Sequence, residues 1–167
     1  MSCFVSMAGR ALKNFLRLST FHGQQGMAFT KAVKKGTLLG ICKAESVVPE
    51  PNKYTVEIKS QVHGRFPDLD FLNHCCSPNL KLEVSSSPDD TAEISAWTVR
   101  DVAEGEQATF HYCTTEKAMD EPFECFCIFG ASNRPRTCLG TVKGYDFLTE
   151  AQKADIDHLV STEWKNS

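Results

Sequence analysis

The sequence has no run of about 18 or more apolar residues, the length that a helix needs to cross a membrane. We therefore expect no membrane partner. It also lacks an excess of positive charge, since the net charge is −3, and this predicts no extended nucleic-acid surface. Apolar residues make up 41% and charged residues 23% of the 167 residues, which is typical of one globular domain with short appendages.

Acidic residues are missing from positions 1–43, which hold seven Lys or Arg residues. A basic segment without acids is typical of an organellar transit peptide, but 14–20 also has the pattern of a first strand. Basic residues interrupt the apolar ones, which disfavours a secretory signal. We expect 1–13 to be a basic N-terminal tail on an intracellular protein of the nucleus or cytoplasm, with organellar targeting as the alternative.

Before residue 149 no apolar stripe is long enough for a helix, so the body is predicted to be mainly β. Apolar and polar residues alternate with a period of two over 54–59 and 80–84. Turn residues then precede another extended run over 92–99, and these two neighbouring runs predict a hairpin. A further extended run follows over 108–113.

The pattern becomes helical at the C-terminal end. Thr149 and Gln152 have the spacing of a capping box, in which each residue satisfies a backbone N–H at the start of a helix. The apolar residues that follow share one helical face. We therefore predict one helix within 149–167.

Cysteine is abundant, with eight residues, and it is unevenly distributed. Cys75 and Cys76 are adjacent, whereas Cys125, Cys127 and Cys138 lie close together nearer the C-terminus. Clustering favours a metal site over a disulfide framework, because thiols stay reduced in the absence of a secretory leader. Zinc prefers four thiolate or imidazole ligands, so the second cluster needs one ligand from elsewhere.

Four segments occur in an order that resembles one family. Residues 71–79 read Phe-Leu-Asn-His-Cys-Cys-Ser-Pro-Asn, and residues 105–112 read Gly-Glu-Gln-Ala-Thr-Phe-His-Tyr. A glycine turn with a later Lys-Gly step spans 23–39, and Cys-x-Cys with a later Cys-Leu-Gly spans 125–140. Together they resemble the SET-domain lysine methyltransferases with a post-SET zinc tail.

The resemblance implies both the fold and the domain boundaries. The fold would be mainly β with short helices, a SET-type β-clip with a knotted C-terminal segment. The SET domain would cover 14–118, the post-SET zinc-binding tail 119–148 and the C-terminal helix 149–167. The four segments together cover nearly the whole chain apart from its ends.

The resemblance also implies S-adenosylmethionine as cofactor. A sulfonium cofactor with an adenine ring needs polar groups that a rigid stretch of backbone holds in one place. An Asn-His pair alone is equally typical of a turn that satisfies its own backbone, but here it stands within the family's motif. The residues implied to bind the cofactor are Gln25, Gly26, Met27, Asn73, His74 and Phe126.

Tyr112 and Phe110 are the catalytic residues that the resemblance implies. Methyl transfer is an in-line displacement, so a lysine amine must be neutral and aligned, although its pKa of ~10.4 keeps it mostly protonated. An aromatic channel disfavours the charged amine by desolvation, and a tyrosine hydroxyl can orient its lone pair. Both side chains are expected on one face of a strand, where core packing is the alternative role. In the family, Phe at position 110 leaves room for di- or trimethylation.

In the family, the cysteine of the Asn-His-x-Cys motif joins three tail cysteines around zinc, which completes the active site as well as the fold. The implied ligands are Cys76, Cys125, Cys127 and Cys138. Ten residues separate Cys127 from Cys138 where the family has about four, so we expect an inserted loop. We interpret the remaining cysteines as buried unpaired thiols: Cys3, Cys42, Cys75 and Cys113.

Three positions depart from the family pattern. Gln24 stands in place of a glycine, Asp70 in place of an arginine and His111 in place of an aspartate. These departures keep two alternatives open, namely a SET-like scaffold that acts on a small molecule and a non-catalytic binding protein. The partner is thus a protein lysine, with histones among the candidates, or a small-molecule acceptor. The sequence leaves the oligomeric state open.

Overall fold

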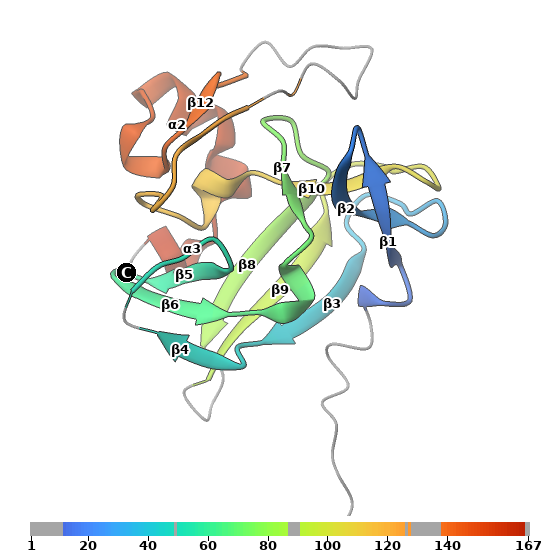
Figure 1. The fold of residues 1–167 in the computed structure, drawn as a ribbon, viewed down its shortest axis with the longest axis horizontal. Helices are drawn as coiled ribbons and strands as arrows, with labels where there is room; N and C mark the ends of the chain where they lie inside the picture. The colour runs from blue at the N-terminus through green and yellow to red at the C-terminus, as the bar shows by residue number, and fades with distance from the viewer. Residues whose placement is uncertain (1–11, 49, 87–90, 126, 128–137, 166–167) are drawn as a thin grey trace, which may run out of the picture.

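The computed structural model describes residues 12–48, 50–86, 91–125, 127 and 138–165. Strands predominate in this part of the chain, and the helices are short (Figure 1). No helix in the described part is long and apolar enough to span a membrane.

One sheet brings together strands that lie far apart in the sequence. Its strands, in spatial order, are β1 (Leu16–Phe21), β2 (Gln24–Phe29), β10 (Gln107–Phe110) and β7 (Asn73–His74). β1 and β2 form an antiparallel hairpin, whereas β7 runs parallel to β10. This order places the Asn-His motif of β7 beside the strand that leads to Tyr112.

The other strands form three smaller sheets in the described part of the chain. They are β3 (Leu38–Lys43) with β9 (Ala92–Thr98) and β8 (Leu80–Ser86), β4 (Ser46–Val48) with β6 (Val62–Arg65) and β5 (Thr55–Lys59), and β11 (Phe123–Glu124) with β12 (Thr141–Val142). The short helices are η1 (Pro67–Leu69), η2 (Tyr112–Thr114), η4 (Tyr145–Phe147), α2 (Glu150–Ile156), η5 (Asp157–Leu159) and α3 (Thr162–Lys165).

The predicted hairpin over 80–99 is confirmed. β8 pairs antiparallel with β9, from Leu80 opposite Thr98 to Ser86 opposite Ala92. Alternate side chains of β9 are buried, as the period of two in the sequence requires when one face packs on the core. The hairpin therefore supplies much of the main hydrophobic cluster.

The extended run predicted over 108–113 is shorter than expected. β10 ends at Phe110, because the chain turns into η2, where Thr114 N donates to His111 O at 2.9 Å. The amide of Tyr112 donates to Nδ1 of His74 at 3.1 Å instead of to a neighbouring strand. Tyr112 therefore lies at the start of a 3-10 turn.

The C-terminal segment begins as predicted and then departs from one continuous helix. The capping box of Thr149 and Gln152 is present at the start of α2. The segment then divides into α2, η5 and α3, because buried Ser161 donates its hydroxyl to Val84 O of β8 at 3.0 Å. Trp164 is 1% exposed and belongs to a second hydrophobic cluster, which also contains Cys76 and Cys125.

Candidate active site

Asn79 fixes the strands of the site to one another. Its side chain is 1% exposed, and Nδ2 donates to Gln107 O at 2.7 Å and to Glu106 Oε1 at 3.0 Å. Its Oδ1 accepts the N–H of Thr109 at 2.9 Å. A side-chain amide can donate and accept hydrogen bonds at the same time, so one buried residue holds β10 against the segment after β7.

The strand crossing, where β2, β10 and β7 lie side by side, gathers most of the residues predicted to bind the cofactor. Asn73 Nδ2 donates to Gln25 O of β2 at 2.9 Å. A Cβ at Gly26 would lie 2.9 Å from Asn73 Nδ2 and 2.6 Å from Gln107 Nε2, so these two side-chain amides would have to shift. Met27 pairs with Ala108 in the same sheet. Phe126, the remaining predicted cofactor residue, lies outside the described residues.

Two of the three departures from the family pattern are accommodated locally. Gln24 is exposed beside the β1–β2 turn, where solvent accommodates its side chain. Asp70 forms a forked ion pair with Arg65, in which Nη2 donates to Oδ2 at 2.6 Å and Nη1 donates to Oδ1. The arginine of β6 therefore neutralises the charge that replaces the family's arginine.

His111, the third departure, is a buried neutral side chain. It is 2% exposed, and Nδ1 has no hydrogen-bond partner among the described residues. Burial lowers the pKa of His111 to about 3. Its ring meets the ring of His74 edge to face at 4.9 Å. His111 therefore packs against His74, and it is not among the residues that line the pocket of Tyr112.

Tyr112 and Phe110 line one pocket of about 290 Å³. Their ring centroids are 4.8 Å apart, and the ring of Phe123 lies 5.7 Å from that of Tyr112. The Tyr112 hydroxyl donates to Leu72 O at 2.9 Å, and burial raises the pKa of this hydroxyl to about 12. The pocket thus presents aromatic rings and one fixed, neutral hydroxyl.

Phe123 is a pocket residue that sequence reasoning missed. The only signal for it is an aromatic residue two positions before Cys125, because the strand that carries it is two residues long. Its ring also meets that of His74 at 5.8 Å, so it joins the pocket to the cysteine cluster.

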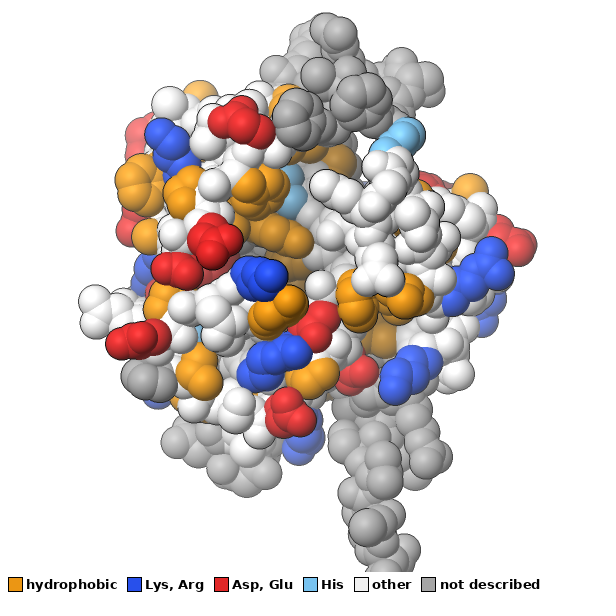
Figure 2. All heavy atoms as spheres, in the orientation of Figure 1, with side chains coloured by type: hydrophobic (Ala, Val, Ile, Leu, Met, Phe, Trp, Pro, Cys, Tyr) orange, Lys and Arg blue, Asp and Glu red, His pale blue; other side chains and the backbone are white. Residues whose placement is uncertain are grey.

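Four acidic residues also line the pocket. Asp70, Glu116, Asp120 and Glu121 line it, and Lys53 is the basic residue among the lining residues of the described chain. Figure 2 shows apolar side chains recessed at the centre of this face, with acidic and basic side chains around them. A pocket with an apolar interior and acidic residues in its wall suits a ligand with an aliphatic chain that ends in a positive charge.

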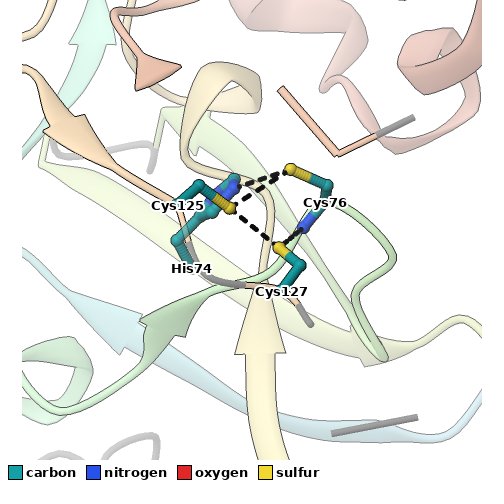
Figure 3. A group of neighbouring side chains, drawn as sticks. All are labelled: His74, Cys76, Cys125 and Cys127. Atoms are coloured by element: carbon teal, nitrogen blue, oxygen red, sulfur yellow. Dashed lines mark hydrogen bonds between the residues drawn. The ribbon is translucent and has the colours of Figure 1, made fainter. Parts of the chain in front are cut away.

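Four side chains form a group that could hold a metal ion. The ligand atoms of His74, Cys76, Cys125 and Cys127 all lie within 4.8 Å of one another (Figure 3). Cys76 Sγ lies 3.6 Å from Cys125 Sγ, which in turn lies 2.8 Å from Cys127 Sγ. β7 and the segment after β11 therefore bring the predicted cysteines together across the sequence.

Cys138 lies at the edge of this group. Its Sγ is 3.7 Å from Cys125 Sγ, and the side chain is exposed. Sulfurs bound to one tetrahedral zinc at about 2.3 Å lie about 3.8 Å apart, so this spacing and that of Cys76 and Cys125 fit zinc. The 2.8 Å between Cys125 and Cys127 is shorter than that edge.

The hydrogen bonds of His74 bear on whether His74 or Cys138 could be the fourth metal ligand. Nδ1 accepts the amide proton of Tyr112, and a backbone amide can only donate. A neutral imidazole therefore carries its proton on Nε2, which lies 3.2 Å from Cys76 Sγ. In this tautomer Nε2 donates to the cysteine and is not free to bind a metal, so Cys138 is the other candidate for a fourth ligand.

Metals bind the thiolate form of cysteine, and the surroundings favour this form at Cys127. Burial raises the pKa of Cys125 to about 12, and a hydrogen bond with Cys127 raises the pKa of Cys76, so a metal would have to displace the protons of these two thiols. Cys76 N donates to Cys127 Sγ at 3.2 Å, and Leu139 N donates to Cys76 Sγ at 3.4 Å. Hydrogen bonds from Cys75 and Cys76 lower the pKa of Cys127. The donor set and its backbone N–H groups therefore suit a zinc ion.

The other cysteines of the described chain are free thiols outside this group. Cys42 is 1% exposed and Cys113 is 0% exposed, and burial raises their pKa values to about 12 and about 11. Cys75 is half-buried, and its Sγ donates to Ser77 O at 3.4 Å. Cys3 lies outside the described residues.

A mainly β scaffold that places an Asn-His strand beside a pocket tyrosine, with cysteines converging behind both, defines the SET class of fold. The SET-domain family profile matches residues 13–113. The chain therefore belongs to the SET-domain family, and the predicted SET family and mainly β SET fold are confirmed. The knotted C-terminal segment and the post-SET zinc tail stay predictions.

The known proteins that are similar to this chain include a methyltransferase and a solved structure. Methyltransferase flvH of Aspergillus flavus is 32% identical over 105 residues, which are 61% of this chain and 53% of that protein. The chain thus spans about half the length of this relative. A crystal structure of a Plasmodium falciparum protein, described as a candidate histone methyltransferase, aligns with a TM-score of 0.51 at 14% identity. That match covers 59% of this chain and 92% of the other, and it concerns the fold alone.

Proposed function

We propose that this chain transfers a methyl group from S-adenosylmethionine to the side-chain amine of a lysine in a protein. The observation that carries the proposal is the Tyr112 hydroxyl, which is held in an aromatic pocket by its hydrogen bond to Leu72 O at 2.9 Å. Leu72 directly precedes Asn73, whose side chain reaches the β2 backbone. One peptide unit therefore joins the pocket tyrosine to the predicted cofactor-binding strand.

The pocket suits a lysine side chain for two reasons. The rings of Phe110, Tyr112 and Phe123 can contact its methylenes and its cationic end, and the acidic wall attracts that charge. Desolvation between the rings then favours the neutral amine that displacement requires. A hydroxyl of raised pKa stays protonated and offers one oxygen with a fixed direction to the amine.

The cofactor supplies an electrophilic methyl group on sulfur when it is bound. Asn73, Gln25 and Gly26 fit the task of holding it, because they present amide and carbonyl groups at a crossing where an added side chain would displace the amide of Asn73. They lie on strands that neighbour β10, and β10 leads into Tyr112. In-line alignment of the amine and the methyl group accounts for a large part of the rate of displacement reactions.

We also propose that Cys76, Cys125, Cys127 and Cys138 hold zinc. The cysteine cluster lies behind the pocket, and His74 connects Cys76 Sγ to the amide of Tyr112. Metal binding would thus hold the tail against the active site. The seven cysteines of the described chain are free, which suits an intracellular, reducing location in the nucleus or cytoplasm.

Titration calorimetry with S-adenosylmethionine tests the first step, and a rise in melting temperature with cofactor provides a second readout. Methyl-labelled cofactor is then incubated with a protein extract freed of small molecules, and the acceptor protein is hydrolysed to amino acids. We expect methyl-lysine, including the di- or trimethyl forms that Phe110 is proposed to permit. Label found only in small molecules would favour the small-molecule alternative, and strictly monomethyl product would contradict the role of Phe110.

A further inference from the structure

The pocket contains a carboxyl group that the proposed function has not used. Glu116 lines the pocket and is half-buried. Thr115 N donates to Tyr112 O at 3.0 Å, so the turn that holds Tyr112 leads directly into Glu116. Glu116 O in turn accepts Tyr145 N at 2.9 Å, which anchors its main chain to η4. The position of the carboxyl relative to the tyrosine is therefore set by two fixed elements.

A second carboxyl, Glu57, lies next to Glu116 but has a structural role. It is 4% exposed, its Oε1 accepts Gln61 N at 3.1 Å and its Oε2 accepts Lys117 N at 2.8 Å. Its own amide donates to Glu116 Oε1 at 3.1 Å. Both carboxylate oxygens of Glu57 thus accept backbone N–H groups, whereas the hydrogen bond from Glu57 N occupies only one oxygen of Glu116.

The charge around Glu116 is predominantly negative. The Asp70 charge is balanced by Arg65, and Lys53 lies over the ring of Tyr54 at 4.9 Å. On the η4 side, Asp146 is a further acid, and Lys117 lies over the ring of Trp164 at 5.5 Å. The other titratable residues that line the pocket are Lys53, Tyr54, Asp70, Tyr112, Asp120 and Glu121, and Glu57 lies next to Glu116.

Resting on the proposed function, we propose that Glu116 binds the ammonium group of the entering lysine and accepts one of its protons. The proton passes from the ammonium nitrogen to the Glu116 carboxylate, which leaves a neutral amine beside Tyr112. The amine lone pair then forms the nitrogen–carbon bond, and the carbon–sulfur bond breaks with its electrons on sulfur. The methylated ammonium leaves, and Glu116 returns its proton to solvent.

The surroundings of Glu116 reduce the difference between its pKa and the pKa of the lysine amine. Burial, followed by repulsion from Glu57, raises the pKa of Glu116 to about 8. A lysine amine has a pKa of ~10.4, so the remaining gap is much smaller than for an ordinary glutamate of pKa ~4.3. Desolvation of the ammonium between aromatic rings narrows this gap further.

Glu116→Gln tests the proposal, because glutamine retains an oxygen that accepts Glu57 N–H and loses the charge. The assay measures initial methyl-lysine formation in the protein extract with wild type and variant at several pH values. A group acting as base is active when ionised, so the wild-type rate should rise as pH passes through about 8. We expect the variant to lose this rise and at least ~100-fold in rate. Its affinity for S-adenosylmethionine should not change. Its melting temperature should not fall, because burial disfavours the charged carboxylate and glutamine carries no charge.

Glu104→Gln removes an exposed carboxyl outside the pocket and should leave both the rate and the pH profile unchanged. Glu116→Asp retains a carboxylate, so it should keep the pH-dependent rise at a lower rate, and it decides the matter if the glutamine variant does not fold. An active wild type with an equally active Glu116→Gln variant and the same profile would overturn this proposal alone. A wild type that makes no methyl-lysine would overturn the proposed function together with this proposal.

Discussion

Replacing Asn79 by alanine tests whether the attachment of β10 to the segment after β7 depends on one buried amide. The change removes the bonds to Gln107 O, Glu106 Oε1 and Thr109 N, at 2.7, 3.0 and 2.9 Å. Glu106 retains Arg100 and Ala103 N as partners, so its loss is small. The backbone groups of Gln107 and Thr109 lose a partner within the sheet.

A buried polar group left without a partner costs about 1–3 kcal/mol. With two such groups, we expect Asn79→Ala to lower the free energy of unfolding by about 3 kcal/mol. For a chain of this size that is a fall in melting temperature of roughly 6–12 °C. Urea unfolding followed by circular dichroism, at constant zinc concentration, measures the difference.

Asn14→Ala is the matched control, since Asn14 is exposed in a turn before β1 and should change stability by less than about 0.5 kcal/mol. A loss below about 1 kcal/mol for Asn79→Ala would refute the reasoning, because at least one of the two backbone groups would then have found another partner.

Three further predictions concern the metal group and the strand crossing of β2, β10 and β7. Cys125→Ser removes the sulfur closest to its neighbours, and elemental analysis of freshly reduced protein should find little bound zinc; a full equivalent would contradict the site. Cys138→Ser should weaken the thiolate-to-metal absorption of the cobalt-substituted protein by about a quarter, whereas an unchanged spectrum would make His74 the fourth ligand. Gly26→Ala displaces Asn73 Nδ2, and calorimetry should show S-adenosylmethionine binding weakened by at least ~10-fold. Equal affinity would show that the strand crossing does not hold the cofactor.

Local patterns in the sequence were sufficient for the hairpin of β8 and β9 and for the start of α2. The hairpin follows from alternation and turn residues, and the capping box of Thr149 and Gln152 depends on neighbours three positions apart. The end of that helix was not predictable, because Ser161 bonds to Val84 from a distant strand. Tertiary contacts decide such breaks.

The candidate site shows the same division. The motifs indicated Tyr112, Asn73 and the cysteines, and the structure brings these residues into one region. That Tyr112 begins a turn could not be predicted, because its amide bonds to the side chain of a residue on β7. Phe123 and Glu116 reach the pocket from separate elements, and no local pattern marks them.

The central claim is that Tyr112 carries methyl transfer in this SET domain. The most direct measurement compares wild type with Tyr112→Phe for cofactor affinity by calorimetry and for methyl-lysine formation from labelled cofactor. Phenylalanine keeps the ring and its packing and loses the hydroxyl that bonds Leu72 O. The account predicts equal affinity and a loss of product formation by at least ~100-fold. Equal product formation by the two proteins, or no cofactor binding by wild type, would contradict it.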